Sequence, residues 1–470
     1  MSDLFPSTAR SLLHRIAREQ AEARAPALMA GVVRDGALVW TGSRGRVDDT
    51  VPSSDTQSRI GSITKTFTAV LVARLRDEGR LDFADPLERH ITGTPLGDRT
   101  IAQLLSHTSG AQAERDGPWW ERTPGDDWPA LSSTFDAHTV KHPGSRRYHY
   151  SNLGFAILGE VVARHRGRSW WDALRGEILE PLELRRTTYL PEAPHAEGYA
   201  VHPWADLVLP EPAHDAGAMA PAGQLWSTIG DLARWAAFIG GDTGGVLSPA
   251  TLAELRDPVI LERAPEWTNG YGLGLRVLRQ NGRTMVGHQG SMPGFLADLL
   301  IDVDEQVGAI TLANTTSGVG GVATDLVGIV LDAEPRLPAE WAPVDALDDS
   351  VLEIVGQWYW GPAAFVLRAR GRELLELTRM SGGERVRFRS NGDGTWIGLD
   401  GYYAGETLRV VREGAERGGS TRGGPGDCRV SHLDLATFTF TREPYDPEAP
   451  GPGGVDPAGW SGLDRPASDA

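Results

Sequence analysis

Residues 59–65 have the sequence RIGSITK, in which Ser62 and Lys65 stand three positions apart. The residues that follow predict a helix from about Ser62 to Glu78, ended by Gly79. A spacing of three puts the hydroxyl and the amine on one helix face, and a serine in the first turn lies near the positive end of the helix dipole. A lysine desolvated there can lose its proton near neutral pH and accept one from the serine.

A helix cap with a solvated lysine one turn later is the alternative interpretation of this stretch, because short S-x-x-K patterns arise by chance. The composition favours the catalytic interpretation. Of the 46 basic residues only Lys65 and Lys141 are lysines, and Lys65 is the one that follows a serine at a predicted helix start.

Two further short motifs could carry chemistry. Residues 150–152 (YSN) open a predicted helix over 153–164, where Asn152 would also serve as a plain N-cap. Residues 287–291 (GHQGS) end a predicted strand, and Gly290 would permit either a close backbone approach or a bulge. Each of these motifs is weak evidence when taken alone.

The segments around these motifs predict an antiparallel sheet built from both ends of the chain. Residues 27–46 are typical of a β-hairpin with an Asp-Gly turn, and residues 271–313 of a meander of strands. A mostly helical insertion separates them. It includes a long irregular segment, 111–147, of the kind that forms lids or binding loops. An amphipathic helix near the N-terminus and a helix at about 319–332 complete this part.

Composition changes at residues 334–338 (EPRLP), which are typical of a linker. Beyond them, short β-like runs recur between turn signals every ~8–12 residues, which predicts a small all-β barrel or sandwich. We expect this domain over 344–445, followed by a Pro- and Gly-rich tail over 446–470. The aromatic residues of this region are predicted to form barrel core rather than a ligand platform. They are Trp358, Tyr359, Trp360, Tyr402 and Tyr403.

The order and separations of Ser62, Tyr150 and His288 together resemble the serine β-lactamase and penicillin-binding-protein family, whose signature is S-x-x-K, then Y-x-N, then K-T-G or H-x-G at a sheet edge. The resemblance covers about residues 10–332. It implies a β-lactamase/transpeptidase-like α/β (α+β) fold over 1–333, with an antiparallel sheet and a helical lobe, and a lipocalin-like barrel after it. Three flanking stretches are similar to the branch that contains class C β-lactamases, DD-peptidases and esterases, namely residues 59–61 (RIG), 104–110 (LLSHTSG) and 180–182 (EPL).

The resemblance implies a role for each residue of the first two motifs. Ser62 would attack a carbonyl carbon, and Lys65 would act as general base in acylation. Tyr150 would be hydrogen-bonded to both, pass a proton to the leaving group and later help to activate water. Asn152 would position the substrate or the lysine.

The same resemblance assigns the oxyanion hole to the backbone N–H groups of Ser62 and Ser291, the latter directly after Gly290. The chain departs from the β-lactamase pattern at His288, where those enzymes carry lysine. A lysine holds a fixed positive charge that can meet a substrate carboxylate, whereas imidazole is largely neutral at pH 7. Family members with histidine here resemble esterases, D-amino-acid peptidases or amidases, so efficient β-lactam hydrolysis is not expected.

The sequence therefore predicts a serine hydrolase that forms an acyl-enzyme on Ser62. Its expected substrates are carboxylic esters or small amides and peptides, including peptides with D-residues. Two alternatives stay open. One is a penicillin-binding-protein-type thioesterase that releases or cyclises nonribosomal peptides. The other is a binding protein of the same fold without turnover, which the presence of Ser62, Lys65 and Tyr150 together argues against.

Charge and the remaining motifs limit other functions. The formal charge of −17 repels phosphate backbones and anionic lipids, so we expect neither nucleic acid nor membrane as a partner. Cys428 is the single cysteine and no signal peptide is visible, so we expect a cytoplasmic protein. We expect no cofactor and no metal, because His138 and His142 lack a third candidate ligand. The expected partner is a small ester or peptide, and the oligomeric state is open.

Overall fold

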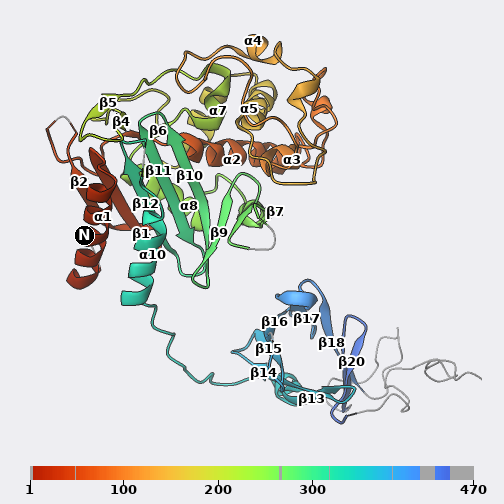
Figure 1. Cartoon of the computed structure of the whole chain (residues 1–470). Coiled ribbons are helices and arrows are strands. Elements are labelled where there is room, and N and C mark those ends of the chain that lie inside the picture. Colours follow the sequence, from red (N-terminus) through yellow and green to blue (C-terminus); the bar gives the residue numbers. More distant parts are fainter. Residues whose placement is uncertain are drawn as a thin grey trace, which may run out of the picture. The chain divides into compact units, whose positions relative to one another are not determined.

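The chain folds into two compact units, Met1–Leu337 and Pro338–Ala470, which are described separately (Figure 1). The predicted tail over 446–470 and Cys428 lie outside the residues that the structure describes. This structure is a computed structural model, and its described residues are 4–47, 49–263, 267–316, 318–383, 385–412 and 429–444. No helix in these ranges is long and apolar enough to cross a lipid bilayer.

An antiparallel sheet forms the centre of the first unit, with the strand order β2-β1-β12-β11-β10-β9-β8-β7. Strand β1 pairs with β12, with Leu28 opposite Ala313, so the two ends of the unit meet in one sheet as predicted. The described strands are β1 (Ala27–Arg34), β2 (Ala37–Gly45), β7 (Ile260–Leu261), β8 (Asn269–Tyr271), β9 (Arg276–Gln280), β10 (Arg283–Met292), β11 (Phe295–Asp302) and β12 (Val307–Ala313).

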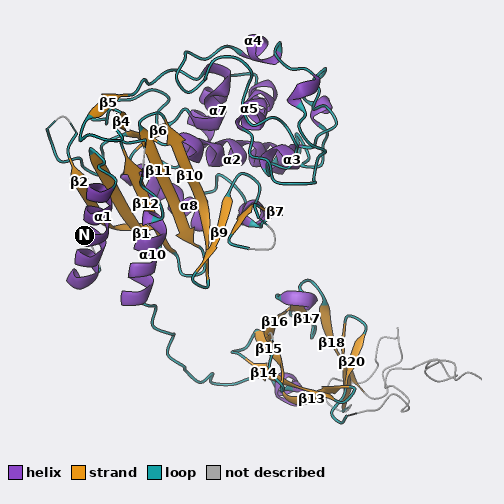
Figure 2. Cartoon of the chain, in the orientation of Figure 1, coloured by secondary structure: helices purple, strands orange, loops and turns teal. Residues whose placement is uncertain are grey.

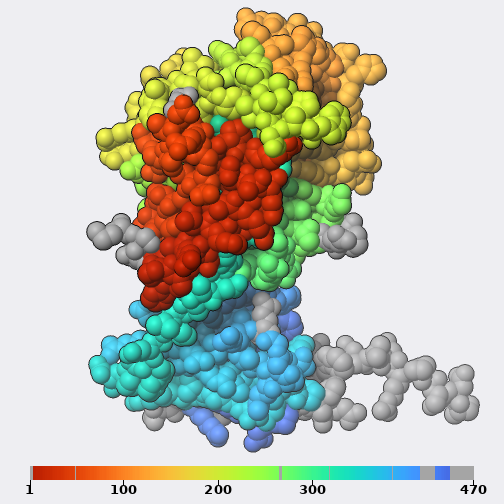
Figure 3. All heavy atoms as spheres, turned by 60° about the vertical axis from the view of Figure 1, so that its left-hand side comes forward, coloured from red at the N-terminus to blue at the C-terminus, as the bar shows by residue number. Residues whose placement is uncertain are grey.

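Helices cover both faces of this sheet (Figure 2). On one face, α1 (Pro6–Glu22) and α10 (Val322–Ala333) pack on the apolar side chains of the central strands. Figure 3 shows the red surface of the N-terminal residues beside the teal segment that contains α10. On the other face, α8 (Ile229–Gly240) joins the sheet to the core of the helical lobe, where Trp235 stacks on Phe67 with ring centroids 3.9 Å apart. The predicted mixed fold with an antiparallel sheet and a helical lobe is confirmed.

The helical lobe contains the predicted helix after Ser62, which consists of a short 3-10 turn, Gly61–Ile63, followed by α2. The other short strands pair as β3 (Ser58–Arg59) with β6 (Trp226–Ser227) and β4 (Tyr199–Val201) with β5 (Val208–Pro210). The described helices of this part are α2 (Thr64–Asp77), α3 (Ile101–Leu105), α4 (Trp128–Ser132), α5 (Asn152–Arg166), α6 (Trp170–Leu174), α7 (Ala220–Gly223) and α9 (Pro249–Arg256).

The meander predicted over 271–313 begins with a break, because β8 and β9 are separated by a turn at residues 272–275. Gly274 adopts a φ of +88°, and a Cβ at this position would lie 2.2 Å from the Cβ of Ala69 in α2. A glycine is therefore needed for this turn to approach the helix. This approach brings together Gly274 and Ala69, which lie about 200 positions apart in the sequence, so a local strand pattern could not predict it.

The second unit is a nearly closed antiparallel barrel whose strands follow one another in the order β13 to β20. Hydrogen bonds between Tyr359 in the first strand and Thr441 beyond the last bring its edges together. The all-β prediction is confirmed, while the likeness to lipocalins stays a prediction. The described strands are β13 (Gly356–Trp360), β14 (Ala363–Ala369), β15 (Leu374–Arg379), β16 (Arg385–Ser390), β17 (Trp396–Gly398), β18 (Thr407–Arg412), β19 (Val430–Leu435) and β20 (Phe438–Phe440).

The barrel aromatics divide between core and surface. Trp358 is fully buried, as predicted, and its Nε1 donates to the carbonyl of Ile354 in the short helix α11 (Asp349–Ile354). The core prediction is wrong for Trp360, which is 46% exposed, and for Tyr402, which is 76% exposed. Trp360 is the last residue of β13, and Tyr402 lies in a short 3-10 turn between β17 and β18. Both side chains therefore lie outside the barrel core.

Candidate active site

Ser62 and Lys65 lie together where the 3-10 turn continues into α2. Lys65 Nζ is 2.8 Å from Ser62 Oγ and 2.6 Å from each of two acceptors, Asn152 Oδ1 and the Ala222 carbonyl. The ammonium can donate to all three oxygens, and once the amine is neutral it can keep the bonds to Asn152 Oδ1 and the Ala222 carbonyl while its lone pair accepts the serine O–H. Lys65 is completely buried, and this desolvation lowers its pKa to about 7 although the nearby acidic side chain of Glu114 raises it.

Tyr150 stands beside this pair, immediately before α5. The helix begins where Ser151 Oγ accepts the backbone N–H of Gly154, an N-cap that holds the preceding residue in place. Lys65 Nζ lies 4.9 Å from the centre of the Tyr150 ring. Burial raises the pKa of the Tyr150 phenol, whereas its hydrogen bond to Ser62 lowers it. The S-x-x-K and Y-x-N motifs therefore lie together around the hydroxyl of Ser62.

Asn152 is held in one orientation by a carboxylate that the sequence motifs did not indicate. Its Nδ2 donates to Glu114 Oε1 over 2.6 Å, and Glu114 Oε2 accepts from Trp120 Nε1 over 2.7 Å. With Nδ2 committed to a carboxylate, Oδ1 must face Lys65. Glu114 lies in the long 111–147 segment, where the predicted functional loop was the only signal for it.

The third motif lies on β10, directly against the turn that carries Ser62. A Cβ on Gly290 would lie 1.9 Å from the carbonyl oxygen of Ile60 and 3.1 Å from Ser62 N, so only glycine allows this approach. A Cβ on Gly61 would likewise lie 2.6 Å from Ser291 N. The backbone N–H groups of Ser62 and Ser291 are thus brought to the same place, as an oxyanion hole requires.

His288 is buried on the same strand, and both ring nitrogens are engaged. Its Nδ1 donates to the carbonyl of Gln289, and its Nε2 accepts the hydroxyl of Tyr271 over 2.9 Å. Burial lowers the pKa of His288 well below its usual value, and the positive charge of Lys65 acts in the same direction. His288 therefore supplies no fixed positive charge where β-lactamases carry lysine.

His107 fixes the backbone on both sides of Tyr150. Its carbonyl accepts the N–H of His149 over 2.8 Å, and its Nδ1 accepts the N–H of Ser151 over 3.0 Å. Its ring lies against that of Tyr150, with centroids 4.2 Å apart. Burial lowers its pKa well below the usual value, so the ring is neutral and a constant acceptor. The resemblance had included His107 only as flanking sequence.

A cavity of about 500 Å³ opens at Ser62 and follows the edge of β10. Arg276 forms part of its wall, paired with both carboxylate oxygens of Glu262 and donating to Gln289 Oε1 over 2.7 Å. Gln289 in turn donates through Nε2 to Asp298 Oδ2 over 3.3 Å, and burial raises the pKa of Asp298 to about 7. Within the described ranges, no group of three or more His, Cys, Asp or Glu side chains is placed to hold a metal ion.

Comparison with known proteins gives the same family for most of the chain. Residues 13–333 match the family model described as Beta-lactamase, and residues 347–442 match a Domain of unknown function (DUF7586). Penicillin-binding protein 4 of Amycolatopsis lactamdurans is 30% identical over 329 residues, which cover 62% of this chain and 83% of that protein. Putative beta-lactamase-like 1 of Homo sapiens is 28% identical over 307 residues, or 61% of this chain. The match spans only 60% of the human relative's length.

A solved structure agrees with this assignment. The D-stereospecific amidohydrolase from Streptomyces sp. superposes with a TM-score of 0.58 at 26% sequence identity, covering 70% of this chain and 98% of the other. The matched region contains the three motifs that the structure brings together around Ser62. The chain belongs to the beta-lactamase family.

Proposed function

We propose that this protein is a serine hydrolase that forms an acyl-enzyme on Ser62 and releases the acyl group to water. The observation that carries the proposal is the 2.8 Å contact between Ser62 Oγ and the buried Lys65 Nζ, an amine whose pKa is about 7. A neutral amine at this distance can take the hydroxyl proton as Oγ forms its bond to the substrate carbonyl carbon.

The remaining steps use groups of the same site. The N–H groups of Ser62 and Ser291 stabilise the oxyanion of the tetrahedral intermediate. As the bond to the leaving group breaks, Tyr150 passes a proton to the departing oxygen or nitrogen and recovers one from Lys65. In deacylation a water molecule attacks the ester carbonyl carbon, and its proton passes to Tyr150 while Tyr150 passes its own proton to the neutral Lys65 amine. As the bond between the carbonyl carbon and Ser62 Oγ breaks, Lys65 returns a proton to Oγ, so the serine, tyrosine and lysine all end in their starting state.

We propose carboxylic esters and small amides or peptides as substrates, including those with D-residues. The neutral His288 supports substrates that present no carboxylate at this position. The only basic side chain on the described wall of the cavity besides that histidine is Arg276, and Glu262 neutralises it. The likeness to a D-stereospecific amidohydrolase favours amides of D-amino acids within this class.

Intact-protein mass spectrometry tests this proposal with three acyl donors: p-nitrophenyl butyrate, D-phenylalanine p-nitroanilide and benzylpenicillin. Wild type and a Ser133→Ala control, altered at an exposed serine in the 111–147 segment, should turn over the ester and the D-amide. A transient acyl adduct should appear on both proteins and be absent from Ser62→Ala.

Turnover by Ser62→Ala at the wild-type rate would overturn the assignment of Ser62 as the nucleophile. Rapid hydrolysis of benzylpenicillin would overturn the part of the proposal that rests on His288. Binding of all three donors by the wild type, with neither adduct nor product, would support a protein without turnover instead.

A further inference from the structure

A second cavity, of about 650 Å³, lies in the helical lobe and is larger than the cavity at Ser62. It is open to solvent and lined by residues of α4, α5, α6, α7 and the segments before α7, and we call it the lobe cavity. Its floor is formed by small residues of α5 and α7, including Gly159, which packs so tightly on Pro221 that a Cβ would lie 2.1 Å from the proline ring. This floor leaves room above it for a ligand of drug-like size.

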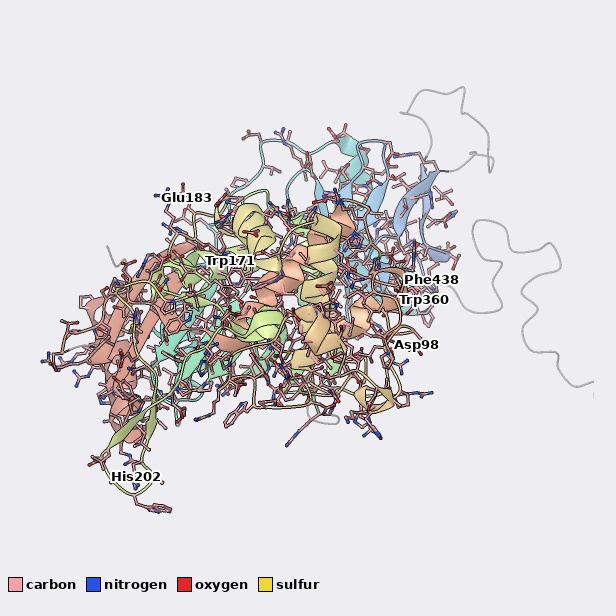
Figure 4. The ribbon with its side chains drawn as sticks, turned by 90° about the horizontal axis from the view of Figure 1, so that it is seen from above. Asp98, Trp171, Glu183, His202, Trp360 and Phe438 are labelled. Carbon is pink, nitrogen blue, oxygen red and sulfur yellow. The ribbon has the colours of Figure 1, made fainter. Side chains whose placement is uncertain are left out.

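Aromatic rings form much of the wall. Trp171 and Tyr189 lie with ring centroids 5.6 Å apart and planes tilted by 58°, and Trp128 is braced edge-on by Phe135. Figure 4 labels Trp171 within the lobe. Trp171 and Tyr189 are both partly exposed, so their rings present free surface to the cavity. Such a wall favours a ligand with an aromatic or aliphatic body.

The acidic side chains on the wall are Glu160, Glu192 and Asp215. Arg164 pairs with Glu160 over 2.8 Å and Arg186 pairs with Glu192 over 3.7 Å, so Asp215 is the carboxylate that remains to pair with a ligand. The hydroxyl of Tyr189 and the N–H of Gly217 both donate to Asp215 Oδ1, which fixes this carboxylate and directs its other oxygen elsewhere. A fixed carboxylate beside indole and phenol faces favours a positively charged ligand through charge pairing and cation–π attraction.

We propose that the lobe cavity is a binding site for an organic cation with an apolar body, of the arylalkylamine type. Neutral molecules of the same shape would lose the charge pairing with Asp215, and carboxylates would be repelled by it. The net charge of −17 of the whole chain acts in the same direction at long range.

This site is separate from the catalytic serine, because α7 stands between them. Pro221 faces the lobe cavity, whereas the carbonyl of the next residue, Ala222, accepts the Lys65 Nζ hydrogen bond on the other side. A ligand in the lobe cavity therefore does not occupy the position of an acyl group on Ser62, and the proposal does not depend on the proposed hydrolase activity.

Isothermal titration calorimetry on the full chain tests the proposal with three probes of similar shape: 2-phenylethylammonium, 2-phenylethanol and phenylacetate. The Ser62→Ala protein is used so that no probe can react. We expect the cation to bind about tenfold or more tightly than the alcohol, and the carboxylate to bind more weakly than both. Equal binding of cation and alcohol would overturn the proposal.

Two variants locate the binding. Trp171→Ala should weaken binding of the cation about tenfold, and Trp204→Ala, which removes an indole that is 89% exposed on the β4–β5 hairpin, should leave it unchanged. Asp215→Asn keeps the shape of the wall and should also weaken it, which protects the test if Trp171→Ala folds poorly. Equal affinities for Trp171→Ala and Trp204→Ala, or no change in Asp215→Asn, would overturn the site.

A final experiment determines which of the two cavities holds the cation. Wild-type protein carrying a stable phosphonyl group on Ser62, formed when Oγ displaces the phenolate of an activated phosphonate ester, should bind 2-phenylethylammonium as tightly as the free protein does. Loss of binding in the modified protein would place the cation in the catalytic cavity and contradict the lobe site.

Discussion

Lys65 in the first unit and Arg387 in the barrel place a basic side chain in opposite surroundings. In the first unit Lys65 is completely buried and surrounded by specific acceptors, whereas in the barrel Arg387 pairs with Asp400 where 56% of the arginine side chain is exposed. Burying an amine costs folding free energy, which is why its pKa falls, while an exposed ion pair costs and contributes little. The buried Lys65 amine therefore belongs to a site arranged for chemistry, whereas the barrel core of Trp358, Phe388 and their neighbours is arranged for packing.

Lys65→Met should give the largest effect, because it tests whether the buried lysine serves catalysis rather than stability. We expect kcat/KM for an ester to fall by about 10³-fold, because the general base is lost. The thermal midpoint of the first unit should stay the same or rise, because an apolar side chain replaces a desolvated amine. Steady-state kinetics and calorimetry measure the two effects. Activity within about tenfold of wild type, or a large loss of stability, would contradict a catalytic role for the buried Lys65 amine.

Trp358→Ala tests the packing side of the comparison. The indole is fully buried, donates to the Ile354 carbonyl and carries the Arg442 guanidinium on its face at 3.8 Å. Truncation should destabilise the barrel by about 3–5 kcal/mol. Differential scanning calorimetry of the full chain should then show the barrel transition at a lower temperature. Equal shifts of every transition would show that the two units do not unfold separately.

His107 provides a sharper test within the first unit, because it acts through backbone hydrogen bonds rather than through charge. His107→Phe removes the acceptor for the Ser151 N–H and should lower kcat about tenfold, with KM much less affected, since Tyr150 loses its support. His107→Asn should restore much of this loss, because Asn Oδ1 can accept the same hydrogen bond and asparagine tolerates the positive φ of 56° at this position. Equal loss in both variants would assign His107 to packing alone.

The pKa of Lys65 predicts the pH dependence of acylation. Because the neutral amine is the base, kcat/KM should rise about tenfold per pH unit below 7 and level off above it. His107 and His288 have pKa values well below their usual range, so they do not titrate in this interval, whereas Asp298 on the cavity wall also has a pKa of about 7 and is removed from the profile in an Asp298→Asn variant. A pH–rate profile between pH 5 and 9 with a non-ionising ester measures the effect. A flat or falling profile through pH 7 would contradict Lys65 as the base.

Much of this first unit could be predicted because its motifs are local. The three-residue spacing predicted that Ser62 and Lys65 share a helix start, and the hairpin and meander patterns predicted a sheet built from both ends of the chain. The partners that complete the site could not be predicted in this way. Glu114 reaches Asn152 from 38 residues away, and His107 meets Tyr150 from a distant loop, so neither leaves a periodic or spacing signal.

The smallest effect is expected at the surface of the barrel, and it completes the comparison. Arg387 donates to both carboxylate oxygens of Asp400, and this pairing raises the arginine pKa and lowers that of the aspartate. Arg387→Ala nevertheless should not move the barrel's thermal midpoint measurably, because water and salt screen an exposed pair. The matched Asp400→Asn variant and the double variant allow a double-mutant cycle at low and high salt. A coupling as large as the loss in Trp358→Ala would contradict the distinction, because exposed charge would then stabilise the barrel as strongly as its buried core does.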